Sequence, residues 1–310
     1  MITPQKILLL GAGELGQAFL LHLITLLNTQ ITIGVRSPSK YQHLATSPNI
    51  SLTPVDHTEP VSTLAKTLAN YSTIITCTGF GQPAGTQKHL TEAVLSAGQL
   101  RRETHPGKEG RLWYFPWQWG VNYDITGDAN GRMPLFGEQL EVRQMLRARA
   151  EETHVKWTIV STGIFMSFLF EPFWGVVDTA GTEVTVRALG YWEHRVTVTD
   201  VNDIGKCVAR IVAGDVESEN RVVYIAGDTV NYKELACILE KVTGQEVKRE
   251  EWTVDYLRQE LEKDSGDQIK KYRMVFAGDG VAWDKKITAN YKLGMQLTNV
   301  ESWTQKNLKF

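Results

Sequence analysis

The chain has 310 residues, of which 42% are hydrophobic and 22% charged, and its formal net charge is −2. This composition is typical of a globular protein, and the charge favours neither nucleic acid nor an anionic membrane surface as a partner. The apolar segments are too short to span a membrane and no secretory signal is present, so we expect a cytoplasmic protein. The three cysteines and seven histidines are scattered without metal-ligand spacing, which predicts reduced thiols and no metal site.

The first predicted strand, Ile7–Leu10, runs into the turn Gly-Ala-Gly-Glu-Leu-Gly, and an apolar-periodic helix follows it. In this pattern Gly11 permits the tight turn, Gly13 lets a pyrophosphate approach the backbone, and Gly16 lets the helix pack on its strand. The helix N-terminus offers N–H groups and a positive dipole end to phosphates. The residues predicted to bind a dinucleotide here are Gly11, Gly13, Glu14, Leu15 and Gly16.

Short apolar strands and helices alternate through the first half of the chain. We expect strands at Ile7–Leu10, Ile31–Val35, Ile50–Thr53, Thr73–Cys77, Arg111–Phe115 and Trp157–Ser161. Helices are expected near Leu15–Leu27, Pro38–Ala45, Pro60–Ala69, Gly85–Ala97 and Pro134–Thr153. The alternation predicts an α/β fold, with a Rossmann-type doubly wound parallel sheet.

The second half is less regular. Short strands fit Val184–Val186 and Val196–Val198, and helices fit Asn231–Thr243, Val254–Lys263 and Asp267–Ala277. We therefore expect a Rossmann domain over residues 1–161 and a smaller, mainly helical C-terminal lobe over 162–310, interleaved, with some segments returning to the sheet.

Arg36 stands 20 positions after Gly16, where an NAD site places an acid for the ribose 2′-hydroxyl. An arginine there, with Lys40 close behind, suits the 2′-phosphate of NADP(H) through a guanidinium pair and a second charge. The alternative is a solvated basic loop.

Ligands of such sheets bind beyond the carboxyl ends of the strands. After the fourth strand, small Thr78 and Gly79 permit close approach of a cofactor and Phe80 can cover it, unless this is a plain Gly/Pro loop. After the fifth strand, an aromatic cluster containing Trp117 and Trp119 is either a hydrophobic plug or the wall of a substrate pocket. The pocket is favoured at the mouth of the sheet. The apolar run after the sixth strand supplies the further pocket candidates Phe165, Met166 and Trp174.

Gln139 lies on the apolar face of the long helix that begins at Pro134. A polar amide on that face needs hydrogen-bond partners. It either pairs with a buried backbone group or faces the active site.

These motifs together resemble the NmrA-like, isoflavone-reductase-like branch of the atypical short-chain dehydrogenases, especially its fungal members. The stretches that carry the resemblance are Gly11–Gly16, Arg36–Lys40, Phe115–Gln118, Val142-Arg143, Ser161–Phe165, Thr197–Gly205, Ala226–Asp228 and Phe276–Trp283. The resemblance implies NADPH as cofactor and hydride transfer to a small, often aromatic, organic substrate, in a monomer or homodimer. It implies that Phe115 and Pro116 flank the nicotinamide, and that Thr162, Gly163 and Phe165 line its far side.

One position departs from the family. Catalytic members carry a lysine three residues before the Val-Arg of the long helix, and this chain has Gln139. An amide does not titrate near neutral pH and cannot serve as a general acid. Tyr123 and His194 are alternative proton donors, with His194 also a pocket candidate.

Three hypotheses follow. In the first, the protein is an NADPH-dependent reductase of an aromatic or alkaloid-like metabolite, such as an iminium that needs no proton donor. In the second, it binds NADP(H) without turnover and reports redox state to a protein partner. In the third, the cofactor and an aromatic pocket hold an intermediate for a cyclisation or rearrangement coupled to hydride transfer.

Overall fold

The computed structural model describes residues 4–79, 81–181 and 183–308. The chain forms two compact units that alternate along the sequence. The first unit contains residues 1–118, 138–160 and 204–223, and the second contains 119–137, 161–203 and 224–310. The chain passes between the two units several times. One of these passages, after residue 160, lies near the domain boundary expected after residue 161.

A seven-stranded sheet forms the centre of the first unit, in the order β11-β6-β5-β4-β1-β2-β3. Its strands are β1 (Gln5–Leu10), β2 (Thr29–Val35), β3 (Ile50–Pro54), β4 (Thr73–Thr76), β5 (Leu112–Phe115), β6 (Val155–Ser161) and β11 (Arg221–Tyr224). The pairs from β3 across to β6 are all parallel. This is the doubly wound order, and it confirms the predicted fold class.

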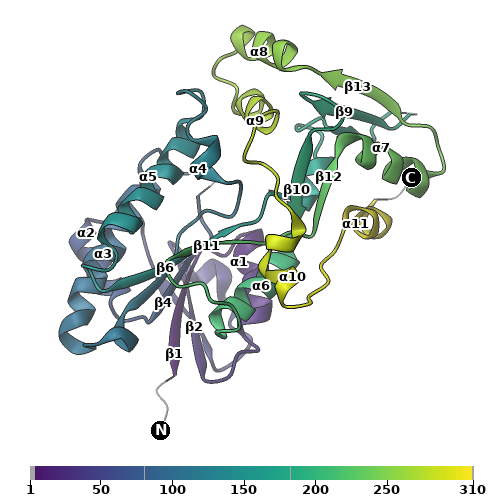
Figure 1. Cartoon of the computed structure of the whole chain (residues 1–310). Helices are drawn as coiled ribbons and strands as arrows, with labels where there is room; N and C mark the ends of the chain where they lie inside the picture. The colour runs from purple at the N-terminus through teal and green to yellow at the C-terminus, as the bar shows by residue number, and fades with distance from the viewer. Residues whose placement is uncertain (1–3, 80, 182, 309–310) are drawn as a thin grey trace. The chain divides into compact units, whose positions relative to one another are not determined.

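Helices cover both faces of this sheet (Figure 1). They are α1 (Glu14–Leu23), α2 (Val61–Leu68), α3 (Thr86–Thr104), α5 (Pro134–Arg149) and α6 (Val201–Val212). Leu8 and Leu10 of β1 pack into the core formed with α2, α3 and α5. On the other face α1 and α6 approach closely, because a Cβ on Gly205 would lie 2.6 Å from the carbonyl oxygen of Ala18. Because successive side chains of each strand point to opposite faces of the sheet, each face can pack against its own layer of helices.

The second unit contains two three-stranded sheets, in the orders β12-β10-β7 and β13-β9-β8. The strands are β7 (Ile164–Phe165), β8 (Val177–Asp178), β9 (Thr185–Leu189), β10 (Arg195–Thr199), β12 (Asp228–Asn231) and β13 (Lys248–Trp252). The helices are α4 (Tyr123–Thr126), α7 (Tyr232–Thr243), α8 (Val254–Lys263), α9 (Gln268–Phe276), α10 (Ala289–Lys292) and α11 (Val300–Asn307). A capping box of Asn231 and Glu234 starts α7.

Short 3-10 helices complete the chain. They are η1 (Pro38–Leu44), η2 (Lys108–Gly110), η3 (Met166–Phe170) and η4 (Lys285–Ile287). The segment expected as an α-helix from Pro38 is therefore a 3-10 helix, while α3 continues to Thr104 beyond its expected end.

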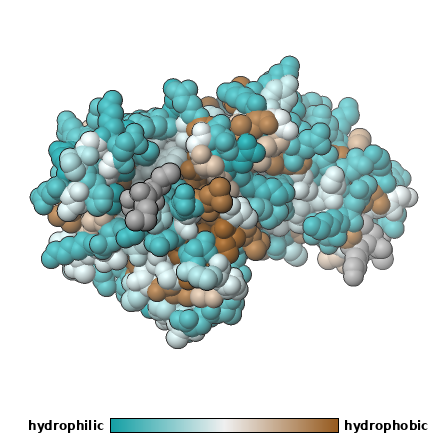
Figure 2. All heavy atoms as spheres, turned by 90° about the horizontal axis from the view of Figure 1, so that it is seen from below, coloured by the Kyte–Doolittle hydropathy of each residue, from teal (hydrophilic) through white to brown (hydrophobic). Residues whose placement is uncertain are grey.

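Hydrophilic residues cover most of the face shown in Figure 2. None of the helices in the described part of the chain combines the length and the hydrophobicity that crossing a membrane requires.

Candidate functional site

The turn after β1 has the backbone geometry that its three glycines predict. Gly11 has a φ of +106°, which favours glycine, and a Cβ there would lie 2.5 Å from Thr78 Cγ2. A Cβ on Gly16 would lie 2.2 Å from the carbonyl oxygen of Gly11, so only glycine lets α1 pack this tightly. Gly13, the N-cap of α1, has no atom within 4 Å of its Cβ position. The turn is therefore closely packed at Gly11 and Gly16 and leaves open space at Gly13.

A cavity of about 250 Å³ opens in front of this turn, at the carboxyl ends of the first four strands. It brings together residues that sequence spacing had singled out: Gly11, Gly13, Arg36, Lys40 and Thr78. The remaining turn residues, Glu14 and Leu15, form the first turn of α1. Phe80, the residue expected to cover the cofactor, lies outside the described residues.

The cavity is rich in groups suited to a phosphate-bearing nucleotide. Arg36 and Lys40 are exposed, and in the described part of the chain neither forms an ion pair, so both cations are available. The Thr78 hydroxyl is buried without a hydrogen-bond partner among the described residues. An open glycine turn, two available cations and an unsatisfied hydroxyl are the groups that a dinucleotide 2′-phosphate and pyrophosphate require.

Three further cavity residues lie just after β3: Asp56, His57 and Thr58. Asp56 Oδ1 accepts from Thr58 N at 2.9 Å and from Thr58 Oγ1 at 2.8 Å. These bonds, with a smaller contribution from Arg36, hold the pKa of Asp56 below its usual value. Burial lowers the pKa of His57, although the Asp56 carboxylate acts in the opposite direction. No local sequence pattern indicated His57 or Thr58.

The backbone of Gln139 on α5 is held by Gln118, from the segment after β5. Its carbonyl oxygen accepts from Gln118 Nε2 at 2.8 Å, and Gln118 Oε1 accepts from Arg143 Nε at 2.7 Å. One residue earlier, the Glu138 carboxylate accepts from the backbone N–H groups of Gly85, Gln87 and Lys88 at the start of α3. Sequence reasoning did not single out Glu138, and it named Gln118 and Arg143 only within family motifs, because the partners of all three lie far away in the chain.

The Gln139 side chain itself is unpaired. It is 1% exposed, and neither its Nε2 nor its Oε1 has a hydrogen-bond partner among the described residues. Of the two alternatives for Gln139, a hydrogen bond to a buried backbone group is therefore absent among the described residues. A buried amide without partners costs free energy. The Gln139 amide therefore offers two unused N–H donors and an unused acceptor oxygen, on a backbone that Gln118 holds in place.

The aromatic segment after β5 packs tightly within the first unit. Phe115 and Pro116 are buried, and the Trp117 ring lies against Gly79. A Cβ on Gly79 would lie 1.9 Å from Trp117 Cδ2. Gly79 therefore makes room for Trp117, which the sequence did not indicate.

In the second unit, Tyr123, Thr162 and Gly163 gather around Gly120. The Gly120 carbonyl accepts from the backbone N–H groups of Thr162 and Gly163 at 2.9 and 3.0 Å. A Cβ on Gly120 would lie 2.5 Å from the hydroxyl of Tyr123, so this tyrosine points at the Gly120 backbone. Phe165, at the end of β7, is half-buried, and Trp119 is buried.

Three predicted pocket residues lie within the packed interior of the second unit. Met166 and Trp174 belong to its apolar core, where Trp174 meets Phe276 edge-to-face at 5.5 Å. His194 donates from Nε2 to the Phe276 carbonyl at 2.8 Å, and burial lowers its pKa. The Nε2 atom of His194 is therefore used in a structural hydrogen bond.

Comparison with known proteins now places the chain. A model of the NmrA-like family matches residues 3–303. The chain belongs to the NmrA-like family. It is 38% identical over 312 residues to an NmrA-like family domain-containing oxidoreductase of Gibberella moniliformis, covering 96% of each chain.

Solved structures show the same NmrA-like fold at lower identity. An isoflavone reductase superposes with a TM-score of 0.79 at 18% identity, covering 99% of this chain and 100% of that one. The binary complex of Vitis vinifera leucoanthocyanidin reductase with NADPH gives 0.73 at 16% identity, covering 97% and 98%. An NADPH-dependent quinone oxidoreductase of Escherichia coli gives 0.71 at 20% identity, covering 95% and 97%.

Proposed function

We propose that this chain is an NADPH-dependent reductase of a small aromatic or alkaloid-like metabolite, acting in the cytoplasm in secondary metabolism. The observation that carries the proposal is the cavity that joins the Gly11–Gly16 turn to Arg36 and Lys40. The oxidoreductase relative at 38% identity and the NADPH complexes of the structural neighbours support the reaction type. Within this proposal the first unit binds the cofactor.

The cavity residues divide the work of holding NADPH. Arg36 and Lys40 pair with the 2′-phosphate, and Gly13 with the start of α1 receives the pyrophosphate. The Thr78 hydroxyl, unsatisfied without a ligand, gains a hydrogen-bond partner there. When bound, NADPH supplies a hydride donor to the substrate.

Gln139 determines which substrates suit this reductase. Its amide donates and accepts hydrogen bonds but releases no proton near neutral pH. Reduction of a carbonyl develops an alkoxide that requires a proton, whereas an iminium carbon accepts a hydride and becomes a neutral amine. An iminium or a similar cationic acceptor therefore fits the chain as it stands, and Tyr123 serves where a proton is needed.

A second candidate is a redox sensor that binds NADP(H) without turnover. The observation that favours it is the packing of Met166 and Trp174 into the core, since they then contribute less to a substrate pocket. A sensor would bind NADPH with Arg36-dependent affinity and still transfer no hydride.

Single-turnover assays with NADPH deuterated at C4, given imines, aldehydes and enones, separate the two candidates. Deuterium transfer to the imines ahead of the aldehydes is the expected result. Gln139→Lys, which restores the residue found in catalytic relatives, should raise transfer to aldehydes relative to imines. NADPH binding without transfer to any member of the panel would replace the reductase with the sensor.

A further inference from the structure

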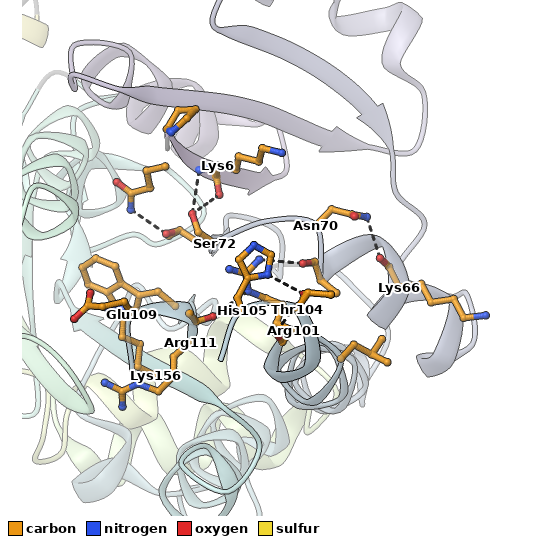
Figure 3. Close-up of a pocket in the computed structure, with 17 residues that line it drawn as sticks. Lys6, Lys66, Asn70, Ser72, Arg101, Thr104, His105, Glu109, Arg111 and Lys156 are labelled. Carbon is orange, nitrogen blue, oxygen red and sulfur yellow. Dashed lines mark hydrogen bonds between the residues drawn. The ribbon is translucent and has the colours of Figure 1, made fainter. Parts of the chain in front are cut away.

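A second, larger cavity of about 740 Å³ lies at the amino ends of the strands of the first unit (Figure 3). Lys6 of β1, Ser72 just before β4, Arg111 just before β5 and Lys156 of β6 all line it. These strands are parallel, so this cavity and the Gly11 turn lie at opposite edges of the sheet. Nothing in the proposed reduction uses it.

Arg101 places a buried positive charge in the wall of this cavity. The side chain is 6% exposed, and it donates to the carbonyls of Ala69 at 3.0 Å and Gly110 at 3.3 Å. A guanidinium has five N–H donors, so these two bonds leave donors over. Within the described residues Arg101 has no carboxylate partner, and burial lowers its pKa.

Lys156 adds a second charge of the same kind. Its ammonium lies 4.6 Å above the Trp113 ring and makes no ion pair within the described part of the chain. Burial lowers its pKa, although Glu219 and Glu109 act in the opposite direction. Partly buried cations without a carboxylate partner are costly, and an anion bound in this cavity would reduce that cost.

The other charges of the wall leave a positive excess. Arg111 is already paired with Glu219 at 2.5 Å, and Figure 3 shows the Lys66 side chain pointing away from the other labelled residues. Lys6, Arg101 and Lys156 also line the cavity, and among its lining residues only Glu109 carries a carboxylate. This excess suits an anion with more than one negative charge.

We propose that this cavity binds a small phosphate-bearing anion, held by Arg101 and Lys156. A phosphate carries about two charges and several acceptor oxygens, which match the unused donors of a guanidinium and an ammonium. The volume lies within the roughly 300–1,000 Å³ of small-molecule sites, so a phosphate ester fits as well as free phosphate. The site is independent of the proposed NADPH cavity.

Calorimetric titration with inorganic phosphate, ribose 5-phosphate and ribose tests the proposal. The Arg36→Ala variant is the background protein, because it weakens the competing phosphate site at the other edge. Saturable binding of ribose 5-phosphate, with ribose inert, is expected. Phosphate binding as tightly as the ester would assign the site to the free ion, whereas no saturable binding of either anion, or equal binding of ribose, would overturn the proposal.

Lys156→Met removes the charge and keeps an apolar stem over Trp113, so the anion should bind about tenfold more weakly. Lys66→Met is the matched control, since Lys66 points away, and its affinity should equal that of the parent. Lys156→Arg should restore binding. Equal affinities of the two methionine variants would contradict the assignment. If Lys156→Met does not fold, Lys156→Gln replaces it, with the same expected weakening and the same contradiction.

Discussion

The indole of Trp117 lies against the backbone of Gly79, at a distance that leaves no room for a side chain. This contact joins the loop after β4 to the segment after β5 within the first unit. It shows that a glycine at a strand end can be required by a neighbouring aromatic ring as well as by a ligand.

We expect Gly79→Ala to lower the free energy of unfolding by about 2 kcal/mol, because the new methyl group must displace Trp117. Chemical denaturation of the ligand-free protein measures this loss, and Trp117 fluorescence should change with it. An unchanged midpoint would mean that the ring moves aside without cost.

Gly13→Ala is the matched glycine control. Its Cβ would meet no atom within 4 Å and its φ is −74°, so the ligand-free protein should unfold as the parent does. NADPH should nevertheless bind more weakly, since the methyl group lies where the pyrophosphate approaches. Loss of stability in both glycine variants would instead point to a general intolerance of side chains at these turns.

Arg36→Ala should weaken NADPH binding by about tenfold to a hundredfold, through the loss of charge-assisted bonds to the 2′-phosphate. NADH lacks that phosphate, so its affinity should change little in the same variant. Isothermal titration with both cofactors makes the comparison internally controlled. A parallel loss of NADH affinity would show that Arg36 supports the cavity rather than the phosphate.

Gln139→Met should raise the free energy of unfolding of the ligand-free protein by about 1 kcal/mol, because it replaces an unpaired buried amide with an apolar side chain of similar length. The control is Gln87→Met. Gln87 is 3% exposed and donates to the Thr78 carbonyl at 3.1 Å, so its replacement should lower stability. Destabilisation by both changes would indicate that Gln139 has partners in solution.

His194 predicts how stability depends on pH. Burial lowers its folded-state pKa below the ordinary value of 6.5, so the unfolded chain takes up the proton first as pH falls. The stabilisation is fully present above about pH 6.5 and is lost as pH falls through the folded pKa. His194→Gln keeps a donor for the Phe276 carbonyl and removes the titration, so its unfolding free energy should fall less between pH 7 and 5. His43→Gln, at an exposed position, should keep the parent's dependence.

Much of the first unit could be predicted from its sequence because its signals are local. The apolar run of β1 and the glycine spacing indicated a strand, a turn and a helix. The 20 positions between Gly16 and Arg36 indicated that this arginine lies at the end of β2. Each of these signals depends on residues that are close together in the sequence.

The missed features depend on distant partners. β13 consists of Lys-Arg-Glu-Glu-Trp, and it is a strand because it pairs with β9, more than fifty residues away. Met166 and Trp174 have the composition of pocket residues, yet the second unit buries them in its core. The Gln118–Arg143 contact that fixes Gln139 spans 25 residues and leaves no periodic signal.

The alternation of the two units also constrains how the chain is made. The first unit is complete only when residue 223 has been synthesised, because β11 occupies one edge of its sheet. During translation, the edge of β6 that β11 later covers therefore stays unpaired until the residues between β6 and β11 have been synthesised. Unpaired strand edges can pair with other chains. We expect nascent chains that stall before residue 221 to depend on chaperones, and expression of residues 1–161 alone to give an aggregation-prone product.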